Sequence, residues 1–435
     1  MNKYLVILLS AIVIIVGCTS SKKSVQPATE ALVDDVEFQQ LTEQARQDSM
    51  NFELHTKVAK MHSNRGLDDE AISWYDKALQ RNSDYIPALI GKGEIFIQQG
   101  KQRDGYGQYL RALMLDKSGK YAESIANAIG QPYQISQITH GNHDNAAPCF
   151  SPKGKSLLFQ SNRDGNMEIY SLELETNYEK RLTDHPAKDE FPVVSPNGKV
   201  IAFISTRDDS GASANSESRE IYFMDLDGNH VARFTTNDAD DWYPSFDSEG
   251  NKLLYVSTSG DIRDIAYHKQ WSDIYLHDIK KNEIERLTEG KFQTGTPCLS
   301  DDGKWLLYNM NPDDNFDIYK MDLETRNTIQ LTSGSGNNAA PEFSPNSKQI
   351  TFFSDRNGNC DIFLMNSDGS NVQQLTCDAM DEAYPRFSPD GKKIVYHARK
   401  GEKMQIFWID LEKPIERDNL VKIIESRMTE LAVMK

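Results

Sequence analysis

The sequence predicts a multidomain fold in which an α-helical solenoid precedes an all-β propeller of six blades. One phrase returns six times: an LT pair, a polar stretch, a proline, "xFSPDGK", an apolar run and a "DIY"-like triplet. A period of about 40–50 residues with short apolar runs and turn signals is typical of propellers, with one repeat per blade. The prolines of the six copies are Pro148, Pro192, Pro244, Pro297, Pro341 and Pro385. Residues 31–130 show a helical period instead.

The first residues have the anatomy of a secretion signal. Lys3 precedes an apolar stretch over residues 4–16 that is too short to span a bilayer, and Gly17 and Cys18 follow it. The letters "IVGC" resemble the lipobox of bacterial lipoproteins, in which the cysteine becomes the lipidated N-terminus. We therefore expect residues 1–17 to be removed and Cys18 to carry the membrane anchor. An ordinary signal peptide with a chance cysteine is the alternative.

A polar tether over residues 18–30 leads to the helical domain over 31–130. Small and aromatic residues recur there after 34 residues, which is the tetratricopeptide pattern. The first set is Ala59, His62, Gly66, Ala71, Tyr75 and Ala78, and the second is Gly93, Phe96, Gly100, Gly105, Tyr109 and Ala112. Two such repeats seldom stand alone, so we expect flanking helices near 31–48 and 118–129.

The fifth repeat shows how one copy of the phrase makes a blade. It divides into four short runs, "PEFS", "KQITFFS", "CDIFLMN" and "NVQQLT", which are rich in β-branched and aromatic residues and separated by turn signals. The pair Asp368-Gly369 is placed to form the hairpin turn between the last two runs. Each repeat therefore predicts four antiparallel strands.

The sixth repeat ends without its fourth strand, and a matching strand stands at the other end of the propeller. The run "YQISQIT" over 133–139 precedes the first blade, so we expect it to close the ring by pairing in the last blade. Closure removes sheet edges that would otherwise template aggregation. The propeller then spans 133–411, and residues 412–435 read as a C-terminal helical tail.

The residues just ahead of the blade prolines are the candidate partner-binding surface. In a four-stranded meander they emerge on the same face as the loops after the second strands. The two longest of those loops, 208–218 and 260–271, are insertions. Acidic and aromatic side chains at the mouth of a rigid ring are typical of a protein-binding hot spot; the alternative is that they cap their own blade turns. The candidates are Asp144, Asn145, Asp189, Glu190, Asp240, Asp241, Trp242, Tyr243, Asn337, Asn338, Asp381, Glu382 and Tyr384.

Composition and motifs argue against several functions. A net charge of −17 with a pI near 5 disfavours binding to nucleic acid or to anionic lipid heads. The loop histidines are scattered over four blades and lack metal-ligand spacing, and the "DGN" runs lack the closing glutamate of a calcium loop. No nucleophile–base constellation can be named. We therefore expect no catalytic residues, no metal and no cofactor.

The propeller cysteines carry one geometric prediction. If Asp368-Gly369 is a two-residue turn, opposed residues in that hairpin have numbers summing to 737, as Cys360 and Cys377 do. Directly opposed residues lie close enough for a disulfide, so this pair is the disulfide candidate. A register slip that leaves the thiols reduced is the alternative. Cys149 and Cys298 occupy equivalent positions three blades apart and should be free and buried.

The repeated phrase, over residues 133–411, closely resembles the TolB-type (WD-like) propeller repeat of bacterial envelope proteins. The resemblance implies a propeller that docks a protein, such as a peptidoglycan-associated lipoprotein. The chain departs from that family in its lipobox and in its tetratricopeptide-like repeats, an order that also resembles a type IX secretion lipoprotein without that protein's terminal OmpA-like domain. Peptidases with similar propellers add a hydrolase domain with a G-x-S-x-G elbow, and that motif does not occur.

These observations predict a non-enzymatic lipoprotein that acts as a scaffold in the cell envelope. The propeller face would dock one envelope protein and the helical repeats a second one. Its membrane association would come through the lipid anchor only, in the outer membrane and facing the periplasm, since Thr19 after Cys18 resembles outer-membrane sorting signals. A component of a type IX secretion complex is the first alternative, and a metal-dependent carbohydrate lyase built on a similar propeller is the second.

Overall fold

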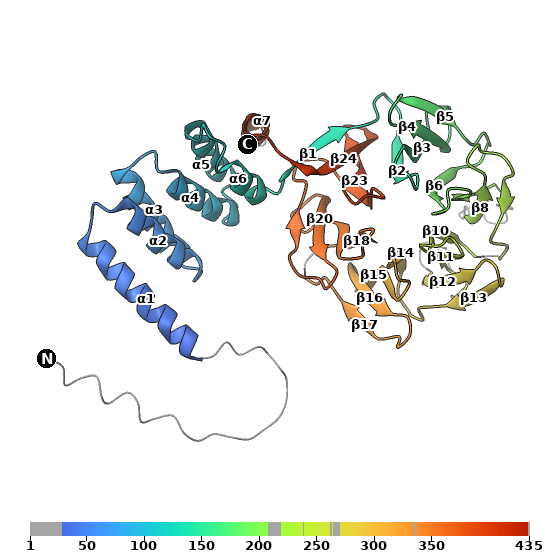
Figure 1. The fold of residues 1–435 in the computed structure, drawn as a ribbon, viewed down its shortest axis with the longest axis horizontal. Coiled ribbons are helices and arrows are strands. Elements are labelled where there is room, and N and C mark those ends of the chain that lie inside the picture. Colours follow the sequence, from blue (N-terminus) through green and yellow to red (C-terminus); the bar gives the residue numbers. More distant parts are fainter. Residues whose placement is uncertain are drawn as a thin grey trace, which may run out of the picture. The chain divides into compact units, whose positions relative to one another are not determined.

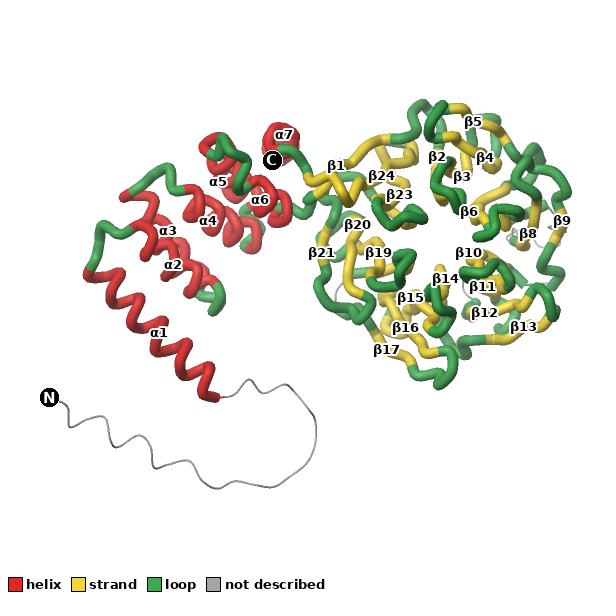
Figure 2. The backbone as a smooth tube through the Cα atoms, in the orientation of Figure 1, coloured by secondary structure: helices red, strands yellow, loops and turns green. Residues whose placement is uncertain are grey.

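A computed structural model describes residues 28–207, 219–237, 239–261, 263, 270–334 and 336–433. The chain divides into two compact units, Met1–Leu115 and Asp116–Lys435. Cys18, the signal sequence and the insertion 208–218 lie outside the described residues, as does most of 260–271. A helical region followed by a six-bladed propeller confirms the predicted fold class (Figures 1 and 2).

Over its described residues, 28–115, the first unit has five helices: α1 (Ala28–Gln47), α2 (Phe52–Ser63), α3 (Asp68–Arg81), α4 (Ile86–Gln98) and α5 (Gln102–Leu115). Small residues let neighbouring helices approach closely. A Cβ atom on Gly93 would lie 2.7 Å from Tyr109 Cε1, and one on Gly105 would lie 2.7 Å from Ile97 Cδ1. Gly105 therefore serves close packing, although glycine lowers helix propensity by about 1 kcal/mol. The assignment of these helices as tetratricopeptide repeats stays a prediction.

The second unit begins with α6 (Ala122–Ala128), which the sequence had placed in the helical domain. The first three blades follow it in chain order. Their strands are β2 (Asn145–Phe150), β3 (Ser156–Ser161), β4 (Glu168–Glu173) and β5 (Tyr178–Arg181); β6 (Asp189–Val194), β7 (Ile201–Ser205), β8 (Glu220–Met224) and β9 (Ala232–Arg233); and β10 (Asp241–Phe246), β11 (Lys252–Ser257), β12 (Asp273–Asp278) and β13 (Glu283–Arg286).

The remaining three blades repeat this meander, and the sixth takes its outer strand from the start of the unit. Their strands are β14 (Thr294–Leu299), β15 (Trp305–Asp313), β16 (Asn315–Asp322) and β17 (Thr328–Gln330); β18 (Asn338–Phe343), β19 (Gln349–Ser354), β20 (Asp361–Asn366) and β21 (Gln373–Gln374); and β22 (Glu382–Phe387), β23 (Lys393–Lys400), β24 (Lys403–Pro414) and β1 (Tyr133–Gln137). In Figure 2, β5, β9, β13, β17 and β21 lie at the rim.

The ring closes as the sequence predicts, through an early strand that completes the last blade. β1 pairs antiparallel with β24, with Ile135 opposite Ile409 and Gln137 opposite Phe407. The backbone N–H of Ile138 adds a bond of 2.7 Å to the Ile406 carbonyl. β24 continues to Pro414, so the C-terminal helix α7 (Arg417–Val433) begins later than the predicted tail.

Each blade has the same aromatic core between its second and third strands. A buried ring on the second strand packs on a ring of the third strand, with centroids 5.5–6.0 Å apart. Such pairs contribute about 0.5–1.5 kcal/mol beyond their burial. The pairs are Phe159–Tyr170, Phe203–Tyr222, Tyr255–Tyr275, Tyr308–Tyr319, Phe352–Phe363 and Tyr396–Phe407.

A buried threonine network explains why the LT pair and the DIY triplet recur together. In every blade the threonine hydroxyl accepts the N–H of the triplet's isoleucine at 2.8–2.9 Å. In four blades it also donates to the triplet's acid, as Thr183 does to Glu168 at 2.6 Å. Each hydroxyl thus replaces a ladder bond where the outer strand ends. The threonines are Thr139, Thr183, Thr235, Thr288, Thr332 and Thr376.

A second six-fold feature surrounds the channel, and we call it the pre-proline belt. The residue before each blade proline has a positive φ of 40–54°, in the left-handed region. There the innermost strand places two residues opposite one residue of the next strand, which is a β-bulge. A left-handed non-glycine residue costs about 1–2 kcal/mol, so six together are a repeated strain. The belt is Ala147, Phe191, Tyr243, Thr296, Ala340 and Tyr384.

Candidate partner-binding cavity at the channel mouth

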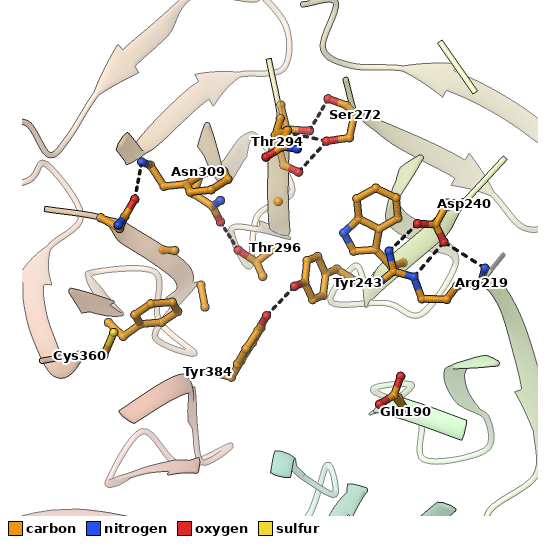
Figure 3. Close-up of a pocket in the computed structure, with 18 of the residues that line it drawn as sticks. Glu190, Arg219, Asp240, Tyr243, Ser272, Thr294, Thr296, Asn309, Cys360 and Tyr384 are labelled. Atoms are coloured by element: carbon orange, nitrogen blue, oxygen red, sulfur yellow. Dashed lines mark hydrogen bonds and ion pairs between the residues drawn. The ribbon is translucent and has the colours of Figure 1, made fainter. Parts of the chain in front are cut away.

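A cavity of about 760 Å³ opens at one mouth of the propeller channel (Figure 3). Two kinds of segment line it: residues ahead of the blade prolines, such as Asp240 and Asn337, and loops after the second strands, such as those of Thr206 and Asp355. The meander topology places both segments on one face, as the sequence argument expected. The cavity therefore draws its walls from several different blades.

Aromatic rings of the pre-proline belt form the floor of this cavity. The hydroxyls of Tyr243 and Tyr384 lie 2.5 Å apart and share a hydrogen bond (Figure 3). The ring centroid of Phe191 lies 5.1 Å from the centroids of both tyrosines. Both tyrosines also line a much smaller void beside Arg386, so their rings separate two spaces along the channel. We call this cavity, with the two tyrosines as its floor, the cup.

One wall of the cup carries an arginine held between an acid and an indole. The Arg219 Nε donates to Asp240 Oδ1 at 2.8 Å, and the Arg219 terminal nitrogen donates to Asp240 Oδ2. The guanidinium carbon lies 4.7 Å from the ring centroid of Trp242, a cation–π distance. Burial lowers the pKa of Arg219, but the hydrogen bond and charge of Asp240 outweigh it and raise the pKa overall. Trp242 is thereby fixed, half-buried, on the cavity wall.

The charge of the lining is negative. Three carboxylates, those of Glu190, Asp240 and Asp355, line the cavity with the single guanidinium of Arg219 among its described residues. Asp355 accepts the backbone N–H of Asn337 at 2.6 Å and the side-chain amide of Asn337 at 2.8 Å. These neutral donors leave its charge in place. A ligand with a cationic or hydrogen-bond-donating group suits this wall better than an anionic one.

The structure brings together six of the thirteen predicted partner-binding residues. Glu190, Asp240, Trp242, Tyr243, Asn337 and Tyr384 all line the cavity. Among the others, Asp144 supports a neighbouring loop, since it accepts the Met404 N–H at 3.0 Å and the Asn162 amide at 2.7 Å. Asp381 is exposed but does not line the cavity.

Five predicted residues are buried and do not form the exposed acidic ring that was expected. Each begins an innermost strand, and its side chain bonds within the propeller, as Asp189 does with Ser205 and Arg207, both at 2.6 Å. The capping alternative describes them better, because a buried carboxylate or amide needs partners from its own fold. The five are Asn145, Asp189, Asp241, Asn338 and Glu382.

Two of these buried acids are incompletely hydrogen-bonded. Asp241 Oδ1 and Glu382 Oε1 have no hydrogen-bond partner in the described structure. Burial raises the pKa of Asp241 to about 6, and burial followed by the charge of Asp378 raises the pKa of Glu382 well above its usual range. Both groups are therefore easier to protonate than ordinary carboxylates.

Sequence reasoning missed several residues of the cavity. Arg219 directly precedes the third strand β8, and Phe316 lies on the third strand β16. Asn309 and Phe353 are on second strands. Their signal was available in part, because the loops after the second strands were assigned to this face. No residue pattern selects these side chains from that face, however, since their direction depends on the twist of each blade.

The predicted disulfide between Cys360 and Cys377 is wrong, because both are free thiols. The register was predicted correctly: Phe363 pairs with Gln374, and their numbers sum to 737. The ladder ends before the cysteines, however, since the Thr376 hydroxyl takes the place of the next backbone acceptor. Cys377 Sγ instead accepts from an Arg427 terminal nitrogen at 2.6 Å. Cys149 and Cys298 are free and buried, as predicted.

The histidine closest to the cavity floor has a structural role. His397 is buried and stacks on Tyr384, with ring centroids 5.5 Å apart, and its Nδ1 accepts the Ala147 N–H at 3.2 Å. Burial lowers the pKa of His397 to about 4. Within the described ranges, no cluster of three or more His, Cys, Asp or Glu side chains is arranged to hold a metal ion. Across those ranges, too, no helix has the length and apolar character needed to cross a membrane.

Comparison with curated proteins finds partial relatives. The chain is 39% identical to the uncharacterized protein Atu1656 of Agrobacterium fabrum over 164 residues, 37% of this chain and 52% of that one. It is 27% identical over 174 residues to the uncharacterized peptidase YuxL of Bacillus subtilis, 40% of this chain and 23% of that one. It is 32% identical over 92 residues to the Tol-Pal system protein TolB of Francisella tularensis, 21% of this chain and 20% of that one. The chain thus spans about half of the first relative and a quarter or less of the others.

Solved structures and a family model resemble the propeller. TolB from Acinetobacter baumannii has a TM-score of 0.46 at 19% identity, covering 68% of this chain and 70% of that one. An oligogalacturonate lyase in complex with manganese has a TM-score of 0.46 at 14% identity, covering 65% of this chain and 95% of that one. The family model for the TolB beta propeller domain matches residues 127–261 and 259–420, well over half of the chain. The chain therefore belongs to the TolB β-propeller (PD40) family.

Proposed function

We propose that this protein is a non-enzymatic scaffold of the bacterial cell envelope, a lipoprotein held in the outer membrane through Cys18 and facing the periplasm. Its propeller binds a segment of an envelope protein in the channel-mouth cavity, and its helical unit binds a second protein. A peptidoglycan-associated lipoprotein or a subunit of a secretion complex fits the first role. The relationship to a Tol-Pal system protein supports this reading.

The aromatic-floored cup carries the proposal. Its rim offers amides and hydroxyls for hydrogen bonding, and Trp242 and Tyr243 supply large rigid rings of the kind that dominate protein-binding hot spots. The ion pair of Arg219 with Asp240 fixes the indole before a partner arrives, which lowers the entropy that binding costs. A cup of about 760 Å³ takes a few side chains of an inserted segment.

The nucleophilic side chains of the cup support binding more than turnover. Burial raises the pKa of Cys360 to about 11, so its thiolate is scarce near neutral pH. The Ser272 hydroxyl donates to the Thr294 carbonyl at 3.0 Å and is not paired with a general base among the described side chains. Because named relatives include a peptidase, purified protein should be assayed on peptide and oligogalacturonide substrates with added manganese. Turnover of either would contradict the proposal.

The direct experiment is photo-crosslinking in intact envelopes. A photoreactive phenylalanine at Phe316 lies in the cup, whereas the same group at Trp305 stands at the opposite end of blade four. We expect a protein cross-linked from Phe316 and not from Trp305. Trp242→Ala should weaken binding of that protein by about 2 kcal/mol, roughly 30-fold.

Trp408→Ala is the matched control for that substitution. Trp408 is also half-buried and also lies beneath a cation, with Lys393 Nζ 4.6 Å from its ring centroid. It belongs to the outer part of blade six and does not line the cup. Equal loss of the partner in both variants would assign the effect to folding and refute the cup as the site. Cys18→Ser should separately release the protein from membranes, and retention at high salt would refute the lipid anchor.

A further inference from the structure

The helical unit contains a cavity of its own, of about 260 Å³, lined by residues of α1, α2 and α3 and of the loop after α1. Ala45, His55 and Trp74 form its buried floor. Its rim is basic although the whole chain has a net charge of −17. The rim cations are Arg46, Lys77 and Arg81, and no acidic side chain lines the cavity among its described residues.

The rim cations are poorly neutralised by the rest of the chain. Lys77 Nζ lies 3.8 Å from the Trp74 ring centroid, and Arg81 Nε donates to the Ser49 carbonyl at 3.0 Å. Neither has an acidic ion-pair partner among the described side chains. Arg46 pairs with Glu43 at 3.6 Å, but both are mostly exposed, so that pair is weak. The rim therefore holds a local positive potential that a carboxylate would neutralise.

The floor supplies an independent sign of a ligand. His55 Nε2 lies 3.1 Å from the Ala45 carbonyl, which can only accept, so that nitrogen carries the proton. His55 Nδ1 is then an acceptor in the neutral ring. It has no partner in the described structure, although the residue is only 3% exposed. A buried acceptor without a donor costs free energy, which a ligand with an N–H group would recover.

We propose that this cavity binds an acidic peptide segment of a partner protein. A peptide brings both required groups: a backbone N–H that can donate to His55 Nδ1 once the floor side chains move aside, and carboxylates that pair with Lys77 and Arg81. A lipid phosphodiester supplies the charge but no donor on its phosphate. Inorganic phosphate can donate through its O–H, but it brings one charged group where an acidic peptide brings several. This inference rests on the proposed function and adds that the second partner presents an acidic segment. Its test does not involve the propeller cup, so either idea can fail alone.

Titration calorimetry of the full chain tests the site with four probes: hexaglutamate, hexaglutamine, inorganic phosphate and phosphatidylglycerol vesicles. We expect saturable binding of hexaglutamate and at least tenfold weaker binding of hexaglutamine and phosphate. Lys77→Glu combined with Arg81→Glu should weaken the binding of hexaglutamate at least tenfold. Lys77→Gln, a milder change at an exposed position, should weaken that binding severalfold.

Arg103→Glu is the matched control, because Arg103 is an exposed cation on α5 outside the cavity. Unchanged hexaglutamate binding in the Arg103 variant supports a local site. Equal losses in the Arg103 and Lys77/Arg81 variants would reduce the effect to net charge and overturn the proposal. Phosphate or vesicles binding as tightly as hexaglutamate would also overturn it, as would hexaglutamate failing to bind.

Discussion

The threonine network and the pre-proline belt are both six-fold, but they repeat different things. The network repeats its side chain as well as its backbone: a threonine hydroxyl accepts an isoleucine N–H in all six blades. The belt repeats only its backbone, a left-handed residue on a bulge, while its side chains range from alanine to tyrosine. A position whose side chain stabilises the fold thus keeps one residue type. A position that faces the channel keeps its backbone conformation but varies its side chain.

Breaking one unit of the network should produce the largest effect. Thr235→Val removes a hydroxyl that accepts the Ile221 N–H at 2.9 Å and donates to Glu220 at 2.6 Å. Two buried groups lose their partner, so we expect the free energy of unfolding to fall by about 3 kcal/mol. Thr236→Val is the control, since Thr236 is the exposed neighbour. Equal urea midpoints for the two variants would show that the network contributes no stability.

Substitution at the start of an innermost strand should have an intermediate effect that depends on pH. Burial raises the pKa of Asp241 to about 6, above its unfolded value, so its contribution to stability is fully present below about pH 4 and is lost as pH rises to 6. Asp241→Asn places there the residue that blades one and five have, Asn145 and Asn338. As the pH rises from 4 to 7, the free energy of unfolding of the variant should therefore increase by on the order of 2 kcal/mol relative to that of the wild type.

The difference between variant and wild type is the quantity to measure, because other buried acids cancel in it. Urea unfolding at pH 4 and pH 7 provides it. Asp302→Asn is the contrasting control: hydrogen bonding to Ser300 lowers the pKa of that exposed carboxyl, so its trend with pH should have the opposite sign. A pH-independent difference for Asp241→Asn would mean that the buried carboxyl stays ionised throughout.

The belt predicts the smallest effect. Ala340 has a φ of 47°, whereas its neighbour Ala339 has an ordinary negative φ. Glycine at either position makes the unfolded chain more flexible, which lowers stability. At position 340 glycine also removes the left-handed strain, which offsets that loss, whereas at position 339 nothing offsets it. Ala340→Gly should therefore be more stable than Ala339→Gly by about 1 kcal/mol. Melting temperatures of the two variants, read side by side, decide whether the belt is strained.

The same contrast decides how much of the structure could be predicted from the sequence. Repeated residues predicted the strands, the ring closure and the hairpin register, since each of those depends on local chemistry that recurs. The channel mouth was harder, because acids such as Asp189 look identical in sequence whether they face solvent or bond inward to Arg207. Whether such an acid is buried depends on the geometry of the bulge, and no residue type in the sequence marks that geometry. Arg219, next to an insertion, had no repeat partner to point to it.

The closing strand also makes blade six a mechanical element. The chain enters the propeller through β1, and that strand is held by its ladder to β24 and by the Thr139 hydroxyl bond of 3.0 Å to Gln405. Tension carried along the chain from its N-terminal side reaches the pairing of β1 with β24 before it reaches any other blade. A pull along the strand loads the ladder bonds together, whereas a pull across it opens them one by one. The direction of an applied force would therefore set how readily the ring opens.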